Sequence, residues 1–121
     1  MFQDISAVVD SMILCRFLQF AISISTFTEM LKVVTGLDFS DNELMEIGKR
    51  IYTLERKFNC EVGFTKKDDL LPPRFLEEEL EEGSSRNRVV QLYEMLDRYY
   101  EIRGWDKNGV PTSETLKELG I

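Results

Sequence analysis

Apolar side chains dominate the first two dozen positions of the chain and leave no wide polar face. They recur at nearly every turn of a helix drawn through this stretch: Val8, Val9, Met12, Ile13, Leu14, Phe17, Leu18, Phe20, Ile22 and Ile24. A helix that is apolar all round must be covered all round. We therefore expect residues 2–24 to form either a central core helix or a surface that docks onto a partner.

The middle of the chain holds the clearest helix signal. Ser40 and Glu43 have the spacing of a capping box, in which each side chain accepts a hydrogen bond from the other residue's backbone amide. Apolar residues then recur every three or four positions, which predicts a helix over 41–58. The six residues that follow contain Gly63 and are predicted to form a loop that carries Cys60.

Three other helices are predicted from apolar spacing and from the residues that end helices. Ser25 and Thr26 begin a short helix that Gly36 ends, a second helix covers 89–103 before Gly104, and a third covers 111–119. Between them, residues 65–75 contain two prolines and read as irregular chain, and residues 77–82 form an acidic strip. The pattern predicts an all-α protein.

Composition favours one small globular domain over residues 1–121. The chain has 43% hydrophobic and 31% charged residues, typical of a folded protein, and a net charge of −7. That charge disfavours binding to nucleic acid or to anionic membranes. The apolar run at 12–24 is interrupted by Arg16 and Gln19 and is too short for a bilayer span. Because histidine is absent, a complete zinc or hydrolase site is not expected.

The two cysteines, Cys15 and Cys60, differ in their surroundings. The N-terminus has no basic region typical of a secretory signal, so we expect reduced thiols and a cytoplasmic location. Cys60 has no cysteine or histidine at ligand spacing. Cys15 follows Ile13 and Leu14, and a lone cysteine in apolar company is usually a small buried residue. A thiolate can also bind an iron–sulfur cluster, but such a cluster normally needs four of them.

Several stretches, in order along nearly the whole chain, resemble the C-terminal domain of the tungsten-containing aldehyde ferredoxin oxidoreductase family. They are AVVDS at 7–11, LCRF at 14–17, GKRIYTLER at 48–56, GFTKKDD at 63–69, LPPRF at 71–75, EMLD with YYEIRGWD within 94–106, GVPT at 109–112 and LKELG at 116–120. The resemblance implies a single small helical domain.

The resemblance also implies chemistry. Family enzymes oxidise aldehydes to carboxylic acids at a tungsten held by pterin dithiolenes, and pass the electrons through a [4Fe–4S] cluster to ferredoxin. Cys15 matches the fourth cysteine ligand of that cluster. Asp10 matches a pterin contact made through its carboxylate, and Leu14 matches one made through its backbone. Ile13 stands where the family usually has glycine, and a β-branched residue resists positive φ.

One cysteine cannot hold the cluster, so we expect this chain alone to bind neither tungstopterin nor [4Fe–4S] and to be inactive. The pterin-binding domain and the domain with the other three cysteines would then be on another chain or missing. Three hypotheses follow: a fragment or remnant of such an enzyme, a subunit of a split enzyme, or a helical interaction module that has lost the redox chemistry. Self-association through residues 2–24 is a further way to cover the apolar stretch.

Overall fold

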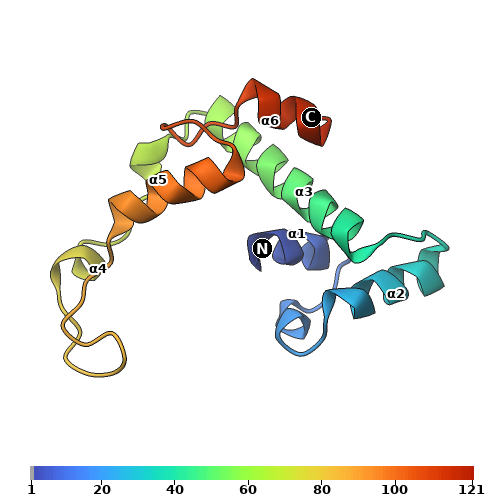
Figure 1. The fold of residues 1–121 in the computed structure, drawn as a ribbon, viewed down its shortest axis with the longest axis horizontal. Coiled ribbons are helices and arrows are strands. Elements are labelled where there is room, and N and C mark those ends of the chain that lie inside the picture. The colour runs from blue at the N-terminus through green and yellow to red at the C-terminus, as the bar shows by residue number, and fades with distance from the viewer. Residues whose placement is uncertain (1) are drawn as a thin grey trace. The chain divides into compact units, whose positions relative to one another are not determined.

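The protein, described here for residues 2–121 of a computed structural model, consists of helices joined by turns and loops (Figure 1). Within these residues there are six α-helices, two 3-10 helices and no strand, apart from two isolated bridges. The elements are α1 (Phe2–Ser11), η1 (Arg16–Phe20), α2 (Ile24–Thr35), α3 (Asp41–Glu61), η2 (Lys66–Asp68), α4 (Arg74–Glu77), α5 (Leu92–Arg103) and α6 (Ser113–Leu119). The all-α prediction is confirmed.

The chain divides into two compact units. The first contains residues up to 56 together with residues 116–121, and the second contains residues 57–115. Helix α3 begins in the first unit and ends in the second, and α6 crosses the other boundary. The expectation of a single domain over 1–121 stays a prediction.

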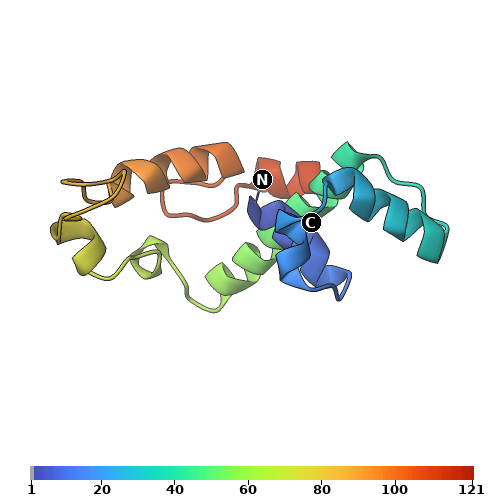
Figure 2. The same ribbon diagram turned by 90° about the horizontal axis from the view of Figure 1, so that it is seen from below.

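The core of the first unit lies where α1, α2 and the first turns of α3 pack together (Figures 1 and 2). Its buried apolar side chains are Val8, Val9, Phe27 and Leu44. Phe27 and Val9 are completely buried. Partly buried side chains from α1, η1, α2 and the turns between them, including Leu14 and Leu18, surround this cluster. The first unit therefore has its own hydrophobic core.

Helices α1 and α3 come unusually close at Gly48. A Cβ atom placed on Gly48 would lie 2.2 Å from the backbone carbonyl oxygen of Asp4 and 3.0 Å from Cγ2 of Val8. Both distances are shorter than van der Waals contact allows. Glycine inside a helix normally weakens it, so its place here is explained by the close approach of the two helices.

The last residues of the chain return to the first unit. The Arg50 guanidinium on α3 donates a hydrogen bond to the Gly120 carbonyl at 3.1 Å, across 70 positions of sequence. The backbone amide of Ile121 donates to the Leu116 carbonyl at 2.9 Å and closes the end of α6. The C-terminal segment is thus attached to a helix formed much earlier in the chain.

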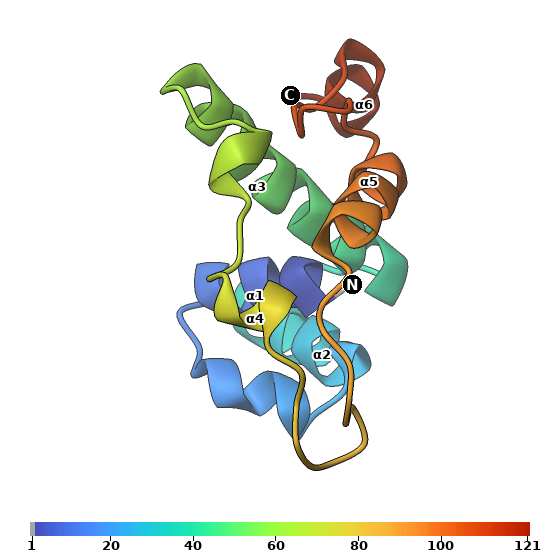
Figure 3. The ribbon, with the colours of Figure 1, turned by 90° about the vertical axis from the view of Figure 1, so that its left-hand side faces the viewer.

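The second unit, whose backbone includes α5 (Figure 3), is built around aromatic side chains. Trp105 follows the end of α5, is buried, and packs edge-on against Tyr99 with ring centroids 5.5 Å apart. Tyr100 is 2% exposed and lies 6.1 Å from the same indole. Gly104 ends α5 with φ of 69°, and its carbonyl accepts hydrogen bonds from Thr112 and Thr115. The end of α5 and the chain just past it therefore share an aromatic core.

The predicted capping box at the start of α3 is present. The Ser40 amide donates to the Glu43 carboxylate at 2.8 Å, and the Glu43 amide donates to the Ser40 hydroxyl at 3.3 Å. The helix runs three residues further than predicted, to Glu61, so the expectation that Cys60 lies in a loop is wrong. The Cys60 thiol instead approaches the Gly109 carbonyl at 3.8 Å. Gly63 supplies the turn only after two more residues.

The capping box predicts a pH dependence of stability. Hydrogen bonds from the Ser40 hydroxyl and amide lower the pKa of Glu43 below its ordinary value of 4.5. A carboxyl group whose pKa is lowered by folding stabilises the fold above its unfolded pKa, and that stabilisation is lost as the pH falls. Ser40→Ala should therefore destabilise the chain more at pH 7 than at pH 3, measured by urea denaturation.

The matched control for that experiment is Ser84→Ala, which removes an exposed hydroxyl in the loop before α5. It should alter stability little and equally at both pH values. An equal loss for Ser40→Ala at pH 7 and pH 3 would contradict the assigned role of Glu43.

Candidate functional site

The apolar N-terminal stretch is not one helix, because α1 ends in a tight turn after Ser11. The Ile13 amide donates to the Asp10 carbonyl at 3.0 Å and the Leu14 amide donates to the Val9 carbonyl at 3.2 Å. These two bonds form a Schellman motif, which requires a left-handed residue at its turn position. Ile13 occupies that position with φ of 58°. The prediction of a continuous helix over 2–24 is therefore wrong, since apolar periodicity does not report this backbone turn.

The side chain and the backbone amide of Leu14 both make contacts within the first unit. Its side chain packs against the buried cluster of the first unit, which provides the apolar contact that usually accompanies this motif. Its amide donates a hydrogen bond to the Val9 carbonyl. Its own carbonyl has no hydrogen-bond partner within residues 2–121. A backbone contact from Leu14 to another molecule would therefore be made through this carbonyl.

Cys15 follows the turn and immediately precedes η1. Its backbone is extended, with φ of −62° and ψ of 124°, and its carbonyl accepts the Leu18 amide at 3.0 Å. The side chain is exposed, so the expectation of a small buried residue is wrong. The apolar neighbours Ile13 and Phe17 are themselves 92% and 80% exposed. The apolar neighbours of Cys15 in the sequence therefore do not bury it in the structure.

Asp10 lies in the last turn of α1 and is also exposed. Within residues 2–121 neither its carboxylate nor the Cys15 thiol has a hydrogen-bond or ion-pair partner. Three groups without a partner in the described part of the chain thus lie within the six residues 10–15: the Asp10 carboxylate, the Leu14 carbonyl and the Cys15 thiol. Residues 2–121 contain no group of three or more cysteine and acidic side chains that could hold a metal ion.

The strained turn yields a testable prediction. A left-handed backbone costs an L-residue about 1–2 kcal/mol, and glycine carries no such cost. Because Ile13 is almost fully exposed, little apolar burial would be lost on its removal. Ile13→Gly should raise the free energy of unfolding by about 1 kcal/mol, measured by urea denaturation.

Val33 provides the control for that prediction, since it is also β-branched and is 85% exposed, but lies inside α2. Val33→Gly should lower stability by about 0.3–0.5 kcal/mol, because glycine is a poorer helix former than valine. If Ile13→Gly destabilises the chain as Val33→Gly does, residue 13 is not strained.

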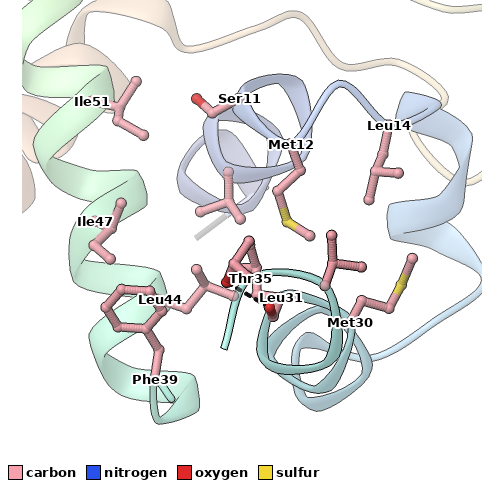
Figure 4. Close-up of a pocket in the computed structure, with 12 residues that line it drawn as sticks. Ser11, Met12, Leu14, Met30, Leu31, Thr35, Phe39, Leu44, Ile47 and Ile51 are labelled. Carbon is pink, nitrogen blue, oxygen red and sulfur yellow. Dashed lines mark hydrogen bonds between the residues drawn. The ribbon is translucent and has the colours of Figure 1, made fainter. Parts of the chain in front are cut away.

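Beside the turn lies an apolar pocket of about 600 Å³ (Figure 4). One wall consists of residues at the end of α1 and the turn after it, and the others come from α2 and the start of α3. Its twelve lining residues are Val8, Ser11, Met12, Leu14, Met30, Leu31, Val34, Thr35, Phe39, Leu44, Ile47 and Ile51. The sequence did not predict this pocket, because its walls belong to three helices whose packing no local pattern reports.

Among residues 2–121, no helix is both long and apolar enough to cross a bilayer.

Comparison with known proteins gives one consistent family. The family model described as "Aldehyde ferredoxin oxidoreductase, domains 2 & 3" matches residues 1–121. The chain is 46% identical to a tungsten-containing aldehyde ferredoxin oxidoreductase of Pyrococcus horikoshii and 44% identical to one of Thermococcus kodakarensis. Each alignment covers 100% of this chain and 20% of the relative. The chain thus spans about one fifth of the length of these relatives.

More distant similarities point to related proteins. The chain is 31% identical, over 97% of its length and 20% of the relative, to an aliphatic sulfonate oxidoreductase, WOR-like subunit, of Pyrococcus furiosus. Among solved structures, the active site complex BamBC of benzoyl coenzyme A reductase aligns with a TM-score of 0.65 and 30% identity. That alignment covers 82% of this chain and 14% of the other.

Proposed function

Because this chain belongs to the aldehyde ferredoxin oxidoreductase family and matches the C-terminal domain of its tungsten enzymes, we propose that it forms that part of an aldehyde-oxidising enzyme. It would supply one cluster ligand and two pterin contacts, and another part of the enzyme would supply the rest. When bound, tungstopterin oxidises the aldehyde to the acid and the [4Fe–4S] cluster passes the electrons on to ferredoxin.

The observation that carries the proposal is the exposed thiol of Cys15. A cysteine that completes a cluster held by another part of the enzyme must present its sulfur at the surface of its own part. The backbone at Cys15 is extended, and the start of η1 anchors its carbonyl through the Leu18 amide. The residue is therefore held by its backbone while its sulfur is available for a ligand bond.

Asp10 and Leu14 fit the proposed pterin contacts by the chemistry of their free groups. A pterin offers several N–H donors, and this turn offers two acceptors, the Asp10 carboxylate and the Leu14 carbonyl. Because the Leu14 amide is already bonded to the Val9 carbonyl, only the carbonyl remains for a backbone contact. The Schellman motif would thus fix the backbone of both acceptor residues just before the residue that binds the cluster.

The chain would not act alone. Residues 2–121 contain two cysteines, and Cys60 lies half-buried on α3 against the Gly109 carbonyl. Four thiolates are the usual requirement of this cluster. Three ligands would therefore come from the part of the enzyme that corresponds to the remaining four-fifths of the relatives. The purified chain is expected to reconstitute no stable four-iron cluster.

The proposal can be tested in a hybrid enzyme. In this hybrid, residues 1–121 replace the matching C-terminal fifth of the Pyrococcus horikoshii relative, and the protein is produced anaerobically with tungstate. The hybrid should contain a four-iron cluster and reduce a viologen dye with an aldehyde. Cys15→Ser should abolish the electron paramagnetic resonance signal of the reduced cluster. It should lower activity by more than about 100-fold, beyond the loss caused by residues that only orient a ligand.

Cys60→Ser is the matched control, because it removes the other thiol and leaves the Asp10–Cys15 turn intact. Its cluster signal and activity should equal those of the unmodified hybrid. If Cys15→Ser retains the cluster, the assigned ligand is wrong. If the unmodified hybrid assembles but contains no cluster, the alternative of an interaction module without redox chemistry is favoured.

A further inference from the structure

The pocket between α1, α2 and α3 is lined mostly by apolar side chains, and some of them stay exposed in the first unit. We propose that it seats an amphipathic helix from the other four-fifths of the enzyme. This inference rests on the proposed function, because it assumes that such a partner exists. It adds the surface by which the two parts meet.

The chemistry of the pocket favours apolar side chains as its occupant. Of the twelve lining residues only Ser11 and Thr35 have polar side chains. The Thr35 hydroxyl is already used. It donates to the Leu31 carbonyl at 2.7 Å (Figure 4) and accepts a hydrogen bond from the Leu37 amide at 3.1 Å. A polar small molecule needs a few convergent polar groups to orient it. The pocket offers a single free hydroxyl, so it suits aliphatic or aromatic groups.

Exposed apolar side chains also occur at the pocket and in the chain just past α2. Val34 lines the pocket and is 83% exposed, and Leu37 just past α2 is 52% exposed. Contiguous exposed apolar surface on a small domain marks an interaction site. Met12 and Met30, one on each side, add flexible side chains that adapt to a partner. Helix α2 has 12 residues, or about 18 Å, enough to flank roughly three turns of a docked helix.

The position of the pocket supports this particular partner. Its wall includes Ser11, Met12 and Leu14, which belong to the same turn as Asp10 and Cys15. A helix seated there would lie beside the exposed thiol. Relatives have about four times more chain than the part matched here, which is where the other cluster ligands would originate. Docking in this pocket would therefore bring the partner to the unfinished cluster site.

Cysteine labelling tests the proposal in the hybrid enzyme and in the isolated chain. Val34→Cys introduces a thiol at the pocket, and both proteins also carry Cys15→Ser so that no result depends on a cluster. A seated helix should make maleimide labelling at position 34 at least about tenfold slower in the hybrid than in the isolated chain, because labelling then requires local opening. Labelled peptides are quantified by mass spectrometry.

Glu29→Cys is the matched control. Glu29 is exposed on α2 and, at about 100° per residue, faces away from the pocket residues 30, 31, 34 and 35. It should be labelled at rates that differ by less than about twofold between the two proteins, since no local opening is needed there. Equal labelling of position 34 in both proteins, or equal protection of positions 29 and 34, overturns the proposal. Protection of position 34 that rises with the concentration of the isolated chain would assign the pocket to a second copy and also overturn it.

The two proposals fail separately. Loss of the cluster in Cys15→Ser tests the ligand and says nothing of the pocket. Protection of position 34 is measured without Cys15 and tests the pocket alone. A hybrid with a cluster but no protection at position 34 would keep the proposed function and remove the docking surface.

Discussion

Gly48→Ala is expected to lower the free energy of unfolding by about 2 kcal/mol, the middle of the range for an overpacked interior. The added methyl group would lie 2.2 Å from the carbonyl oxygen of Asp4. That oxygen belongs to the backbone of α1, so no side-chain rotation can relieve the clash and α1 must move away from α3. Alanine's better helix propensity, worth up to about 1 kcal/mol, offsets only part of this cost.

Thermal denaturation followed by circular dichroism would show the effect as a fall in Tm of roughly 8 °C. Glu55→Ala is the control, because Glu55 is exposed on the same helix and its replacement leaves the contact between α1 and α3 unchanged. A Gly48→Ala variant as stable as Glu55→Ala would show that α1 does not approach α3 at this residue.

Phe27→Ala should destabilise the chain still more, by about 3–5 kcal/mol, the usual cost of removing a buried phenylalanine. Phe27 is completely buried in α2 and packs in the cluster with Val8, Val9 and Leu44. Small domains have little stability to spare, so this variant is expected to be largely unfolded at room temperature, as circular dichroism and urea denaturation would report.

Phe17→Ala provides the comparison, because it deletes the same side chain at a position that is 80% exposed. Its effect should be within about 0.5 kcal/mol, as for most surface substitutions. Equal losses for the two variants would mean that the core of the first unit is not centred on Phe27.

Most helices could be predicted because their ends are encoded locally. The capping box of Ser40 and Glu43, and the glycines at 36, 104 and 120, all mark helix boundaries in the structure. The overextended prediction at the N-terminus has a physical cause. Helix α1 ends at a left-handed residue, and the sequence offers isoleucine there instead of the glycine or asparagine that would signal such a turn.

The candidate site was predictable only in part. The segment that contains Asp10 and Cys15 could be singled out from the sequence, but its exposure could not. Ile13, Leu14 and Phe17 suggested a buried cysteine, whereas the turn after α1 buries Leu14 partly and leaves Ile13 and Phe17 exposed. The roles of Asp10, Leu14 and Cys15 stay predictions until the hybrid enzyme is tested.

The attachment of the C-terminus to α3 has a consequence for how the protein is made. Arg50 leaves the ribosome long before Gly120, the carbonyl to which it donates, has been synthesised. Since chains emerge from their N-terminus at about 5–20 residues per second, the first unit must wait several seconds for its final segment. The intervening residues, 57–115, emerge during this delay. Synthesis of the second unit is thus complete before synthesis of the first unit, whose residues both precede and follow it in the sequence.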